Sequence, residues 1–328
     1  MKAFELIEKL VVLHGPSGDE QAVAQVLAEL AKPFADEVRT DVLGSLIVRK
    51  KGKGPKILFA AHMDTVGVVA THIEKNGAVR LGRLGAVTPQ DLLHARVRFQ
   101  NGTVGTVRAD AVAEGKALKV DDLFLEVGAA DAAQAEKLVR VGDTAVYADG
   151  AFRAGDRVCA PSLESRAACA ALLLALEKLD RTDNDLYFVF TAQGQVGARG
   201  AKTAAFDVAP DYAVVLDGAA ADDMPGGKKT LALGKGAAIK IMDGAVLCHP
   251  RMVENLNTLA KKEKLAHQSA VGGTGAGDAG PIHQTRLGVC TGSVCIPCRY
   301  PHSPDEWADI KDVESCAALV AAFAHSKF

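Results

Sequence analysis

The chain has 328 residues, a formal net charge of −2 at pH 7, and 48% hydrophobic residues. This length and apolar content allow a large core and more than one domain. A nearly neutral chain sets up no field that attracts nucleic acid or an anionic membrane surface, and no apolar run approaches the ~18 residues of a membrane span, so neither partner is expected. Seven cysteines spread over this length do not suggest a disulfide framework, and a reducing, cytoplasmic setting is therefore expected.

The first 67 residues predict two helices followed by strands. From the spacing of apolar residues, the predicted elements are a helix at 4–11, a second helix whose apolar stripe runs from Val23 to Leu30 and which ends near Pro33, and strands at 38–41, 43–48 and 57–60. The segment His14-Gly15-Pro16-Ser17-Gly18 separates the helices, and Ser17 or Asp19 is expected to cap the second one. Glu5 and Glu8 interrupt the first apolar residues, which argues against a signal peptide.

The character of the sequence changes after Gly67. Residues 68–157 are rich in β-branched residues, glycine and short alternations, with one helix expected at 129–138. Asn101-Gly102 lies between two short apolar alternations and predicts a tight β-hairpin. We therefore predict a β-rich domain at 68–157, inserted into an α/β domain formed by 1–67 and 158–328.

The α/β pattern resumes after the insert. The predicted elements are helices at 167–179, 250–264 and 313–323 and strands at 184–190, 212–216 and 289–296. Ligand sites in open α/β sheets gather beyond the carboxyl ends of the strands. The polar residues at or just past such ends are His62, Asp64, Gln195, Asp217 and His302.

The segment Ala61-His62-Met63-Asp64 ends the first buried strand. Side chains at i and i+2 of a strand leave by the same face, so His62 and Asp64 point together. Such a pair can ligate a metal, with the acid orienting the imidazole. The alternative is a satisfied histidine beside a solvated aspartate, which the four residues alone favour. The matching placement of Gln195, Asp217 and His302 at other strand ends favours the metal site.

Several short segments, in this order along the chain, resemble one family. They are Gly15-Pro16-Ser17-Gly18, Asp41-Val42-Leu43-Gly44, Ala61-His62-Met63-Asp64, Leu233-Gly234-Lys235-Gly236, Asp278-Ala279-Gly280, Ile296-Pro297-Cys298-Arg299-Tyr300 and His302-Ser303-Pro304. The chain thereby resembles the tetrahedral aminopeptidases, also labelled glutamyl aminopeptidases or endoglucanase M. The resemblance implies a metallopeptidase-type catalytic domain, a phosphorylase/hydrolase-like three-layer α/β/α fold with a mixed sheet, and an inserted PDZ-like dimerisation domain. It also implies a cytoplasmic location, peptide substrates, and homo-oligomers built from dimers up to a dodecamer.

The implied chemistry is hydrolysis of an N-terminal peptide bond by up to two divalent metals per chain, zinc or cobalt. The metal ligands that the resemblance implies are His62, Glu164, Gln195, Asp217 and His302. Asp64 is implied as the catalytic residue that orients His62. The glycine-rich stretch 272–277 and Asp278 after it are implied to line the substrate cavity.

Three positions depart from the family pattern. Gly194 stands where the family has a glutamate base, Gln195 stands where it has a glutamate ligand, and Glu164 stands where it has a bridging aspartate. The extra methylene of Glu164 moves its carboxylate by roughly 1 Å, whereas metal–ligand distances tolerate about 0.2 Å unless the backbone adjusts. Loss of a positioned base typically costs ~10²–10⁴ in rate.

These departures leave two hypotheses. In the first, the chain is a metal-dependent aminopeptidase with an attenuated or rewired site, in which the longer Glu164 serves as base. In the second, it is a non-catalytic relative, a pseudoenzyme that binds peptides or modifies an assembly. The three neighbouring substitutions favour the second hypothesis. Metal content distinguishes them, because two metals per chain favour an enzyme and none favours a binding protein.

Overall fold

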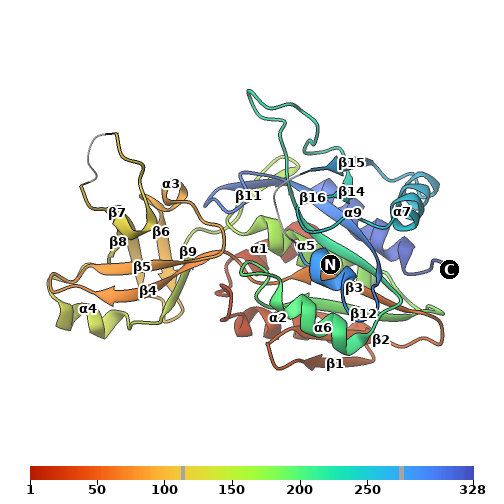
Figure 1. The fold of residues 1–328 in the computed structure, drawn as a ribbon, viewed down its shortest axis with the longest axis horizontal. Coiled ribbons are helices and arrows are strands. Elements are labelled where there is room, and N and C mark those ends of the chain that lie inside the picture. The colour runs from red at the N-terminus through yellow and green to blue at the C-terminus, as the bar shows by residue number, and fades with distance from the viewer. Residues whose placement is uncertain (112–114, 273–276) are drawn as a thin grey trace.

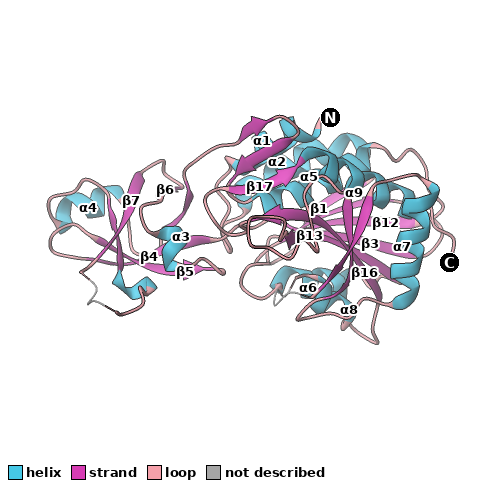
Figure 2. Cartoon of the chain, turned by 90° about the horizontal axis from the view of Figure 1, so that it is seen from above, coloured by secondary structure: helices cyan, strands magenta, loops and turns pink. Residues whose placement is uncertain are grey.

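The computed structural model describes residues 1–111, 115–272 and 277–328. Figures 1 and 2 show a large layered α/β body, which contains both termini, and a smaller β-barrel to one side of it. Throughout the described ranges, no helix has the length and apolar character needed to cross a membrane.

The large body is organised around a mixed sheet of eleven strands. Its strands are β1 (Glu37–Thr40), β2 (Leu46–Lys50), β3 (Lys56–His62), β10 (Phe152–Ala154), β11 (Arg157–Ala160), β12 (Asp185–Thr191), β13 (Tyr212–Ala220), β14 (Ala237–Met242), β15 (His267–Val271), β16 (Cys290–Arg299) and β17 (Glu306–Asp309). The path runs β1-β2-β12-β3-β13-β16-β17-β11-β10, and β14 pairs with β16 and β15 beside it. β12, β3, β13 and β16 are parallel, so their carboxyl ends lie along the same edge of the sheet.

Helices cover both faces of this sheet. They are α1 (Ala3–Val11), α2 (Gln21–Ala31), η1 (Lys32–Phe34), α5 (Leu163–Glu177), α6 (Arg199–Val208), α7 (Pro250–Lys262), α8 (Ala279–His283) and α9 (Ile310–Phe323). In β3, Ile57, Phe59 and Ala61 pack in the core under α1, α2, α5, α7 and α9. Leu58 and Ala60 of the same strand pack in a second core under α6 and α8. A strand buried on both faces is continuously apolar, which is why this segment reads as an apolar run.

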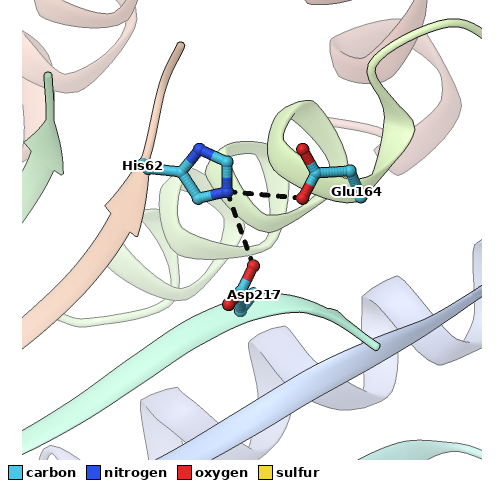
Figure 3. A group of neighbouring side chains, drawn as sticks. All are labelled: His62, Glu164 and Asp217. Carbon is cyan, nitrogen blue, oxygen red and sulfur yellow. Dashed lines mark ion pairs between the residues drawn. The ribbon is translucent and has the colours of Figure 1, made fainter. Parts of the chain in front are cut away.

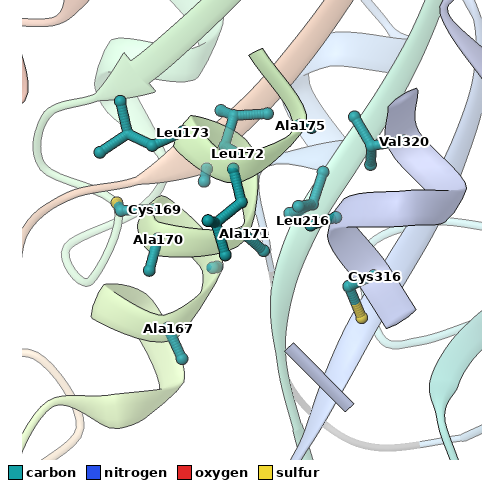
Figure 4. Packing of buried hydrophobic residues seen from close by; sticks show 14 of the residues in the cluster. Ala167, Cys169, Ala170, Ala171, Leu172, Leu173, Ala175, Leu216, Cys316 and Val320 are labelled. Atoms are coloured by element: carbon teal, nitrogen blue, oxygen red, sulfur yellow. The ribbon is translucent and has the colours of Figure 1, made fainter. Parts of the chain in front are cut away.

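Helix α5 is buried on every side. All residues from Leu163 to Leu176 are buried, because the helix lies between the sheet and the neighbouring helices α1 and α9. Figure 4 shows Ala171 and Leu172 of α5 near Leu216 of β13, with Val320 of α9 beside them. Small residues let the helix approach its neighbours closely, and from Ala167 to Leu176 it is apolar all round and has no solvent face. The buried helix holds its first turn, and Glu164 within it, at a set position above the sheet.

The smaller body is a closed barrel with the strand order β4-β5-β8-β7-β6-β9. Its elements are β4 (Gly67–Ile73), β5 (Val79–Leu84), α3 (Pro89–Leu92), β6 (Arg96–Phe99), β7 (Val104–Ala109), η2 (Val120–Asp122), β8 (Leu123–Glu126), α4 (Ala132–Leu138) and β9 (Thr144–Tyr147). It has an apolar core of its own, which includes Val97, Phe99 and Val107. The predicted hairpin at Asn101-Gly102 is confirmed, because β6 and β7 pair antiparallel on either side of it.

Several expected bounds differ from those of the structure. Strand β10 lies inside the stretch predicted as the insert, but it pairs with β11 in the large sheet, since a short hairpin at 154–157 joins the two strands. Helix α5 begins at Leu163, four residues before the predicted start, so Glu164 belongs to the helix. Helix α2 is preceded by Glu20 and has no side-chain cap, contrary to the expected role of Ser17 or Asp19. The Ser17 hydroxyl instead bonds to Asp64.

Candidate metal centre

His62, Glu164 and Asp217 come together beyond the carboxyl ends of two parallel strands. His62 ends β3, and Asp217 lies on β13, which runs beside β3 in parallel register. Glu164 comes from the first turn of α5, above this edge of the sheet. Figure 3 shows the two carboxylates pointing toward one nitrogen of the imidazole. The fold therefore gathers three side chains that are more than 50 residues apart in sequence.

The three side chains form a compact donor set. Nε2 of His62 lies 3.3 Å from Oε2 of Glu164 and 3.4 Å from Oδ1 of Asp217. One donor atom from each residue lies within 4.8 Å of the others, and across the described residues this is the one group of three or more histidine, cysteine or acidic side chains that meets that limit. Zinc accepts imidazole nitrogen and carboxylate oxygen ligands, and catalytic zinc sites use three protein ligands with a further position left open.

The charges at this point favour a cation. Burial opposes protonation of His62, but Glu164, Asp217 and Asp64 outweigh it and raise its pKa well above the ordinary value. The same carboxylates that stabilise a proton on the imidazole stabilise a divalent metal in its place. The residues present therefore fit one metal ion, held by His62, Glu164 and Asp217. A divalent metal bound there would polarise a carbonyl and lower the pKa of a bound water.

Asp64 lies behind His62 and fixes the loop that follows β12. Oδ1 of Asp64 lies 3.3 Å from Nδ1 of His62 and accepts a 2.7 Å bond from the backbone N–H of Gly194. Oδ2 accepts bonds from the Ser17 hydroxyl at 2.6 Å and from the Gln195 backbone N–H at 2.9 Å. Burial alone would raise the pKa of Asp64, but these donors outweigh it and lower the pKa. Asp64 therefore contacts the His62 imidazole on one side and the backbone of the loop after β12 on the other.

Gly194 leaves no room for a side chain in this arrangement. A Cβ atom built on Gly194 would lie 2.5 Å from Cβ and 2.7 Å from Cγ of His62, and 2.9 Å from Oδ1 of Asp64. These distances are far inside normal van der Waals contact. The loop therefore sits directly against the histidine, and the position expected for a general base is occupied by backbone.

Gln195 reaches Glu164 with its side chain. Nε2 of Gln195 donates a hydrogen bond to Oε1 of Glu164, the oxygen turned away from His62. The predicted ligand thus contacts another predicted ligand through its amide N–H. A donor group directed at the carboxylate does not offer a lone pair to a metal at that point.

His302 lies at the edge of the group. Its Nε2 is 3.8 Å from Oε1 of Glu164, and its side chain is 29% exposed, against 8% for His62. Within the part of the chain that the structure describes, His302 does not join the compact donor set. It stands beside Glu164, on the side that faces Gln195.

Glu306 is a residue of this site that the sequence reasoning missed. Its carboxylate is completely buried and accepts 2.8 Å bonds from the backbone N–H groups of both Glu164 and His302. Burial and then the neighbouring Glu164 charge raise its pKa to about 8. Glu306 thereby links the first turn of α5 to the loop that contains His302. The one signal for it in the sequence is an acid on the short strand that follows His302-Ser303-Pro304.

Asp278 lies near the centre but outside the donor set. It is buried and its Oδ2 accepts a hydrogen bond from the Thr191 hydroxyl, while Oδ1 has no partner among the described residues. Burial raises its pKa to about 6. Most of the adjoining glycine-rich stretch, residues 273–276, lies outside the described residues, so the predicted lining of a substrate cavity is not tested there.

Comparison with known proteins places nearly the whole chain in one family. The family model for M42 glutamyl aminopeptidases matches residues 44–319. This chain belongs to the M42 glutamyl aminopeptidase family. A curated relative from Acetivibrio thermocellus is 39% identical over 97% of each chain. The family assignment confirms the resemblance drawn from the short sequence motifs, and it supports the aminopeptidase and metallopeptidase character of the fold.

Solved structures of the same family superpose closely on the chain. The aminopeptidase APDkam598 from the archaeon Desulfurococcus kamchatkensis is 36% identical, with a TM-score of 0.95 over 99% of this chain and 95% of its own. The TET1 peptidase of Pyrococcus horikoshii is 27% identical, with a TM-score of 0.89 over 99% of this chain and 100% of its own. That peptidase assembles into a tetrahedron or a large octahedral shell. The mixed α/β fold of this M42 chain is thus that of the tetrahedral aminopeptidases.

Proposed function

We propose that this M42 chain binds the N-terminal part of peptides at a metal centre whose hydrolytic step is attenuated or absent. The observation that carries this proposal is the position of Gly194. Backbone lies against His62 where a glutamate base is expected, so no side chain at that position takes a proton from an attacking water. Glu164, the remaining candidate base, is held by Gln195 on one oxygen and faces His62 with the other.

The remaining residues have roles that need no base. His62, Glu164 and Asp217 would hold a divalent metal, zinc or cobalt, and Asp64 would orient His62. Such a metal can still bind and polarise a peptide carbonyl. Polarisation without a positioned proton acceptor leaves the water poorly activated, which is expected to slow hydrolysis by ~10²–10⁴.

The direct test is peptidase activity on chromogenic amino-acid amides, with zinc or cobalt added. We expect little or no turnover by the wild-type protein, and any residual turnover should be lost in His62→Ala. A turnover near the ~10 s⁻¹ of an ordinary enzyme would refute the proposal, provided that His62→Ala abolished it. Several amides with acidic, basic and apolar side chains are needed, so that a narrow substrate preference is not mistaken for inactivity.

A second candidate function is a non-catalytic role as a peptide-binding or assembly-modifying relative. The same three substitutions, at Glu164, Gly194 and Gln195, favour it, because they alter the chemistry of the site and leave the scaffold in place. Binding of a non-hydrolysed peptide, measured by calorimetry with metal present, is expected for this role. Weak but metal-dependent turnover would instead support an attenuated enzyme.

The barrel has a proposed role in assembly. We infer that the expected insert, 68–157, is a PDZ-like dimerisation domain attached to the α/β domain of 1–67 and 158–328, and that the chain forms dimer-based homo-oligomers up to a dodecamer. Support comes from the assemblies of the P. horikoshii peptidase. A cytoplasmic location is part of the same proposal. Sedimentation analysis tests the assembly, and a monomer at micromolar concentration would contradict it.

A further inference from the structure

The two oxygens of the Glu164 carboxylate have different partners. Oε2 lies 3.3 Å from Nε2 of His62, on the side of the candidate metal position. Oε1 accepts the hydrogen bond from Nε2 of Gln195 and lies 3.8 Å from Nε2 of His302. Glu164 is buried, so its carboxylate depends on these groups for stabilisation. One oxygen thus faces a metal position, and the other is bound by an amide.

The orientation of the Gln195 amide follows from its surroundings. A carboxylate accepts hydrogen bonds, so the NH₂ end of the amide is the end that fits against Glu164. The backbone N–H of Gln195 donates to Asp64, which fixes the start of the side chain. Gly85, which follows β5 of the barrel, lies beside the same side chain, since a Cβ atom built on Gly85 would lie 3.0 Å from Cβ and 3.4 Å from Oε1 of Gln195. The carbonyl oxygen is therefore turned away from Glu164.

A second metal does not fit beside this amide. An amide hydrogen and a cation both need a lone pair of Oε1, and the amide already uses that side of the oxygen. The carboxylates of Glu164 and Asp217 balance the charge of one divalent cation. A second cation would have His302 and Gln195 as its other ligands, and neither brings a negative charge. Charges buried without an ionic partner carry a large desolvation penalty.

We propose that the Gln195 carboxamide takes the place of a second cation at Glu164, so that the centre holds one divalent metal per chain. Gln195 is then a positioning residue, because its hydrogen bond turns Oε2 of Glu164 toward His62 and Asp217. The inference uses the same metal position as the proposed function. The number of bound metals does not depend on whether the protein hydrolyses peptides, so the two proposals fail separately.

The test is a titration of metal-free protein with Co²⁺, followed by calorimetry and by the visible absorption of bound cobalt, without substrate. Wild type is expected to bind one equivalent. Gln195→Ala should also bind one equivalent, with Kd raised ~10–100-fold, because the carboxylate loses its orienting partner. Gln195→Glu should bind a second equivalent, because an anionic oxygen replaces the amide donor beside Glu164 and His302.

A matched control is Gln193→Glu, two residues away in the same loop. The side-chain oxygen of Gln193 accepts a 3.2 Å bond from Arg199, so the new charge has a partner outside the centre. It should bind one equivalent with wild-type affinity. Two equivalents or none in wild type would overturn the proposal, and so would wild-type affinity in Gln195→Ala. The alanine variant keeps the proposal falsifiable even if Gln195→Glu does not fold.

Discussion

The contact between Gly194 and His62 makes Gly194→Ala the most informative single change in this protein. A methyl group at this position would begin 2.5 Å from Cβ of His62, a distance about 1 Å inside ordinary van der Waals contact. Cβ of His62 is anchored to a buried strand and cannot rotate away. Either the loop moves off Asp64, losing the 2.7 Å bond from Gly194, or His62 moves. Such overpacking typically costs about 1–3 kcal/mol.

Two measurements follow this change. Urea denaturation of the metal-free protein should show a loss of about 1–3 kcal/mol, and cobalt affinity should fall ~10-fold or more, since His62 or its orienting partner has shifted. Gly150→Ala is the matched control, because a Cβ atom there would lie 3.7 Å from its nearest neighbour, Val12. Equal stability and unchanged cobalt affinity in the two variants would refute the reasoning. By the same geometry, Gly194→Glu alone should not restore a base unless the loop moves.

Three further predictions concern the surroundings of the centre. Burial raises the folded-state pKa of Glu306 to about 8 and that of Asp312 to about 7, against ~4 for unfolded carboxyls, so the fold holds more protons over this range. The stability of the metal-free protein should therefore fall as pH rises from ~5 to ~8, by up to about 1.4 kcal/mol per pH unit for each group. The variant Glu306→Gln should show a flatter dependence of stability on pH. Urea midpoints that rise with pH would contradict this prediction. Tyr147 of the barrel donates a 3.3 Å hydrogen bond to the backbone oxygen of His302, so Tyr147→Phe should cost about 1 kcal/mol in a urea melt, and a variant as stable as wild type would show that the contact contributes nothing. Elemental analysis should find no bound metal in His62→Ala. It should find the wild-type amount in Asp278→Asn, because Asp278 lies outside the donor set among the described residues. Loss of metal in Asp278→Asn would show that the donor set is incomplete.

Local patterns were enough to predict the elements around the site. The run before His62 is apolar because both faces of β3 are buried, and this made the strand visible without its neighbours. The ends of parallel strands lie along one edge, so His62 and Asp217 were predicted to share a site, and the structure brings them within 3.4 Å. Strands with mixed exposure were harder to find, and β14 and β15 were missed because their pattern is set by pairing beside β16.

Some features of the centre depend on distant contacts. Glu306 carries no motif of its own, yet its two oxygens hold the backbone of Glu164 and of His302. Gln195 was expected as a metal ligand, because that is what its place in the sequence implies. The fold instead directs its amide N–H at Glu164. Which end of an amide faces which neighbour is decided by packing, and no one-dimensional pattern records it.

The sequence by itself determined the family, the apolar strands, and the chemical types of the residues at their ends. It also showed that Gly194 and Gln195 bring no negative charge to the site, because that follows from residue identity alone. Only the tertiary structure decided which of the site's side chains contact one another. It placed His62, Glu164 and Asp217 within 4.8 Å of one another, and it set the Gly194 backbone against the imidazole. The physical reason is that residue type sets which interactions are available, whereas packing of segments distant in sequence sets which of them are made.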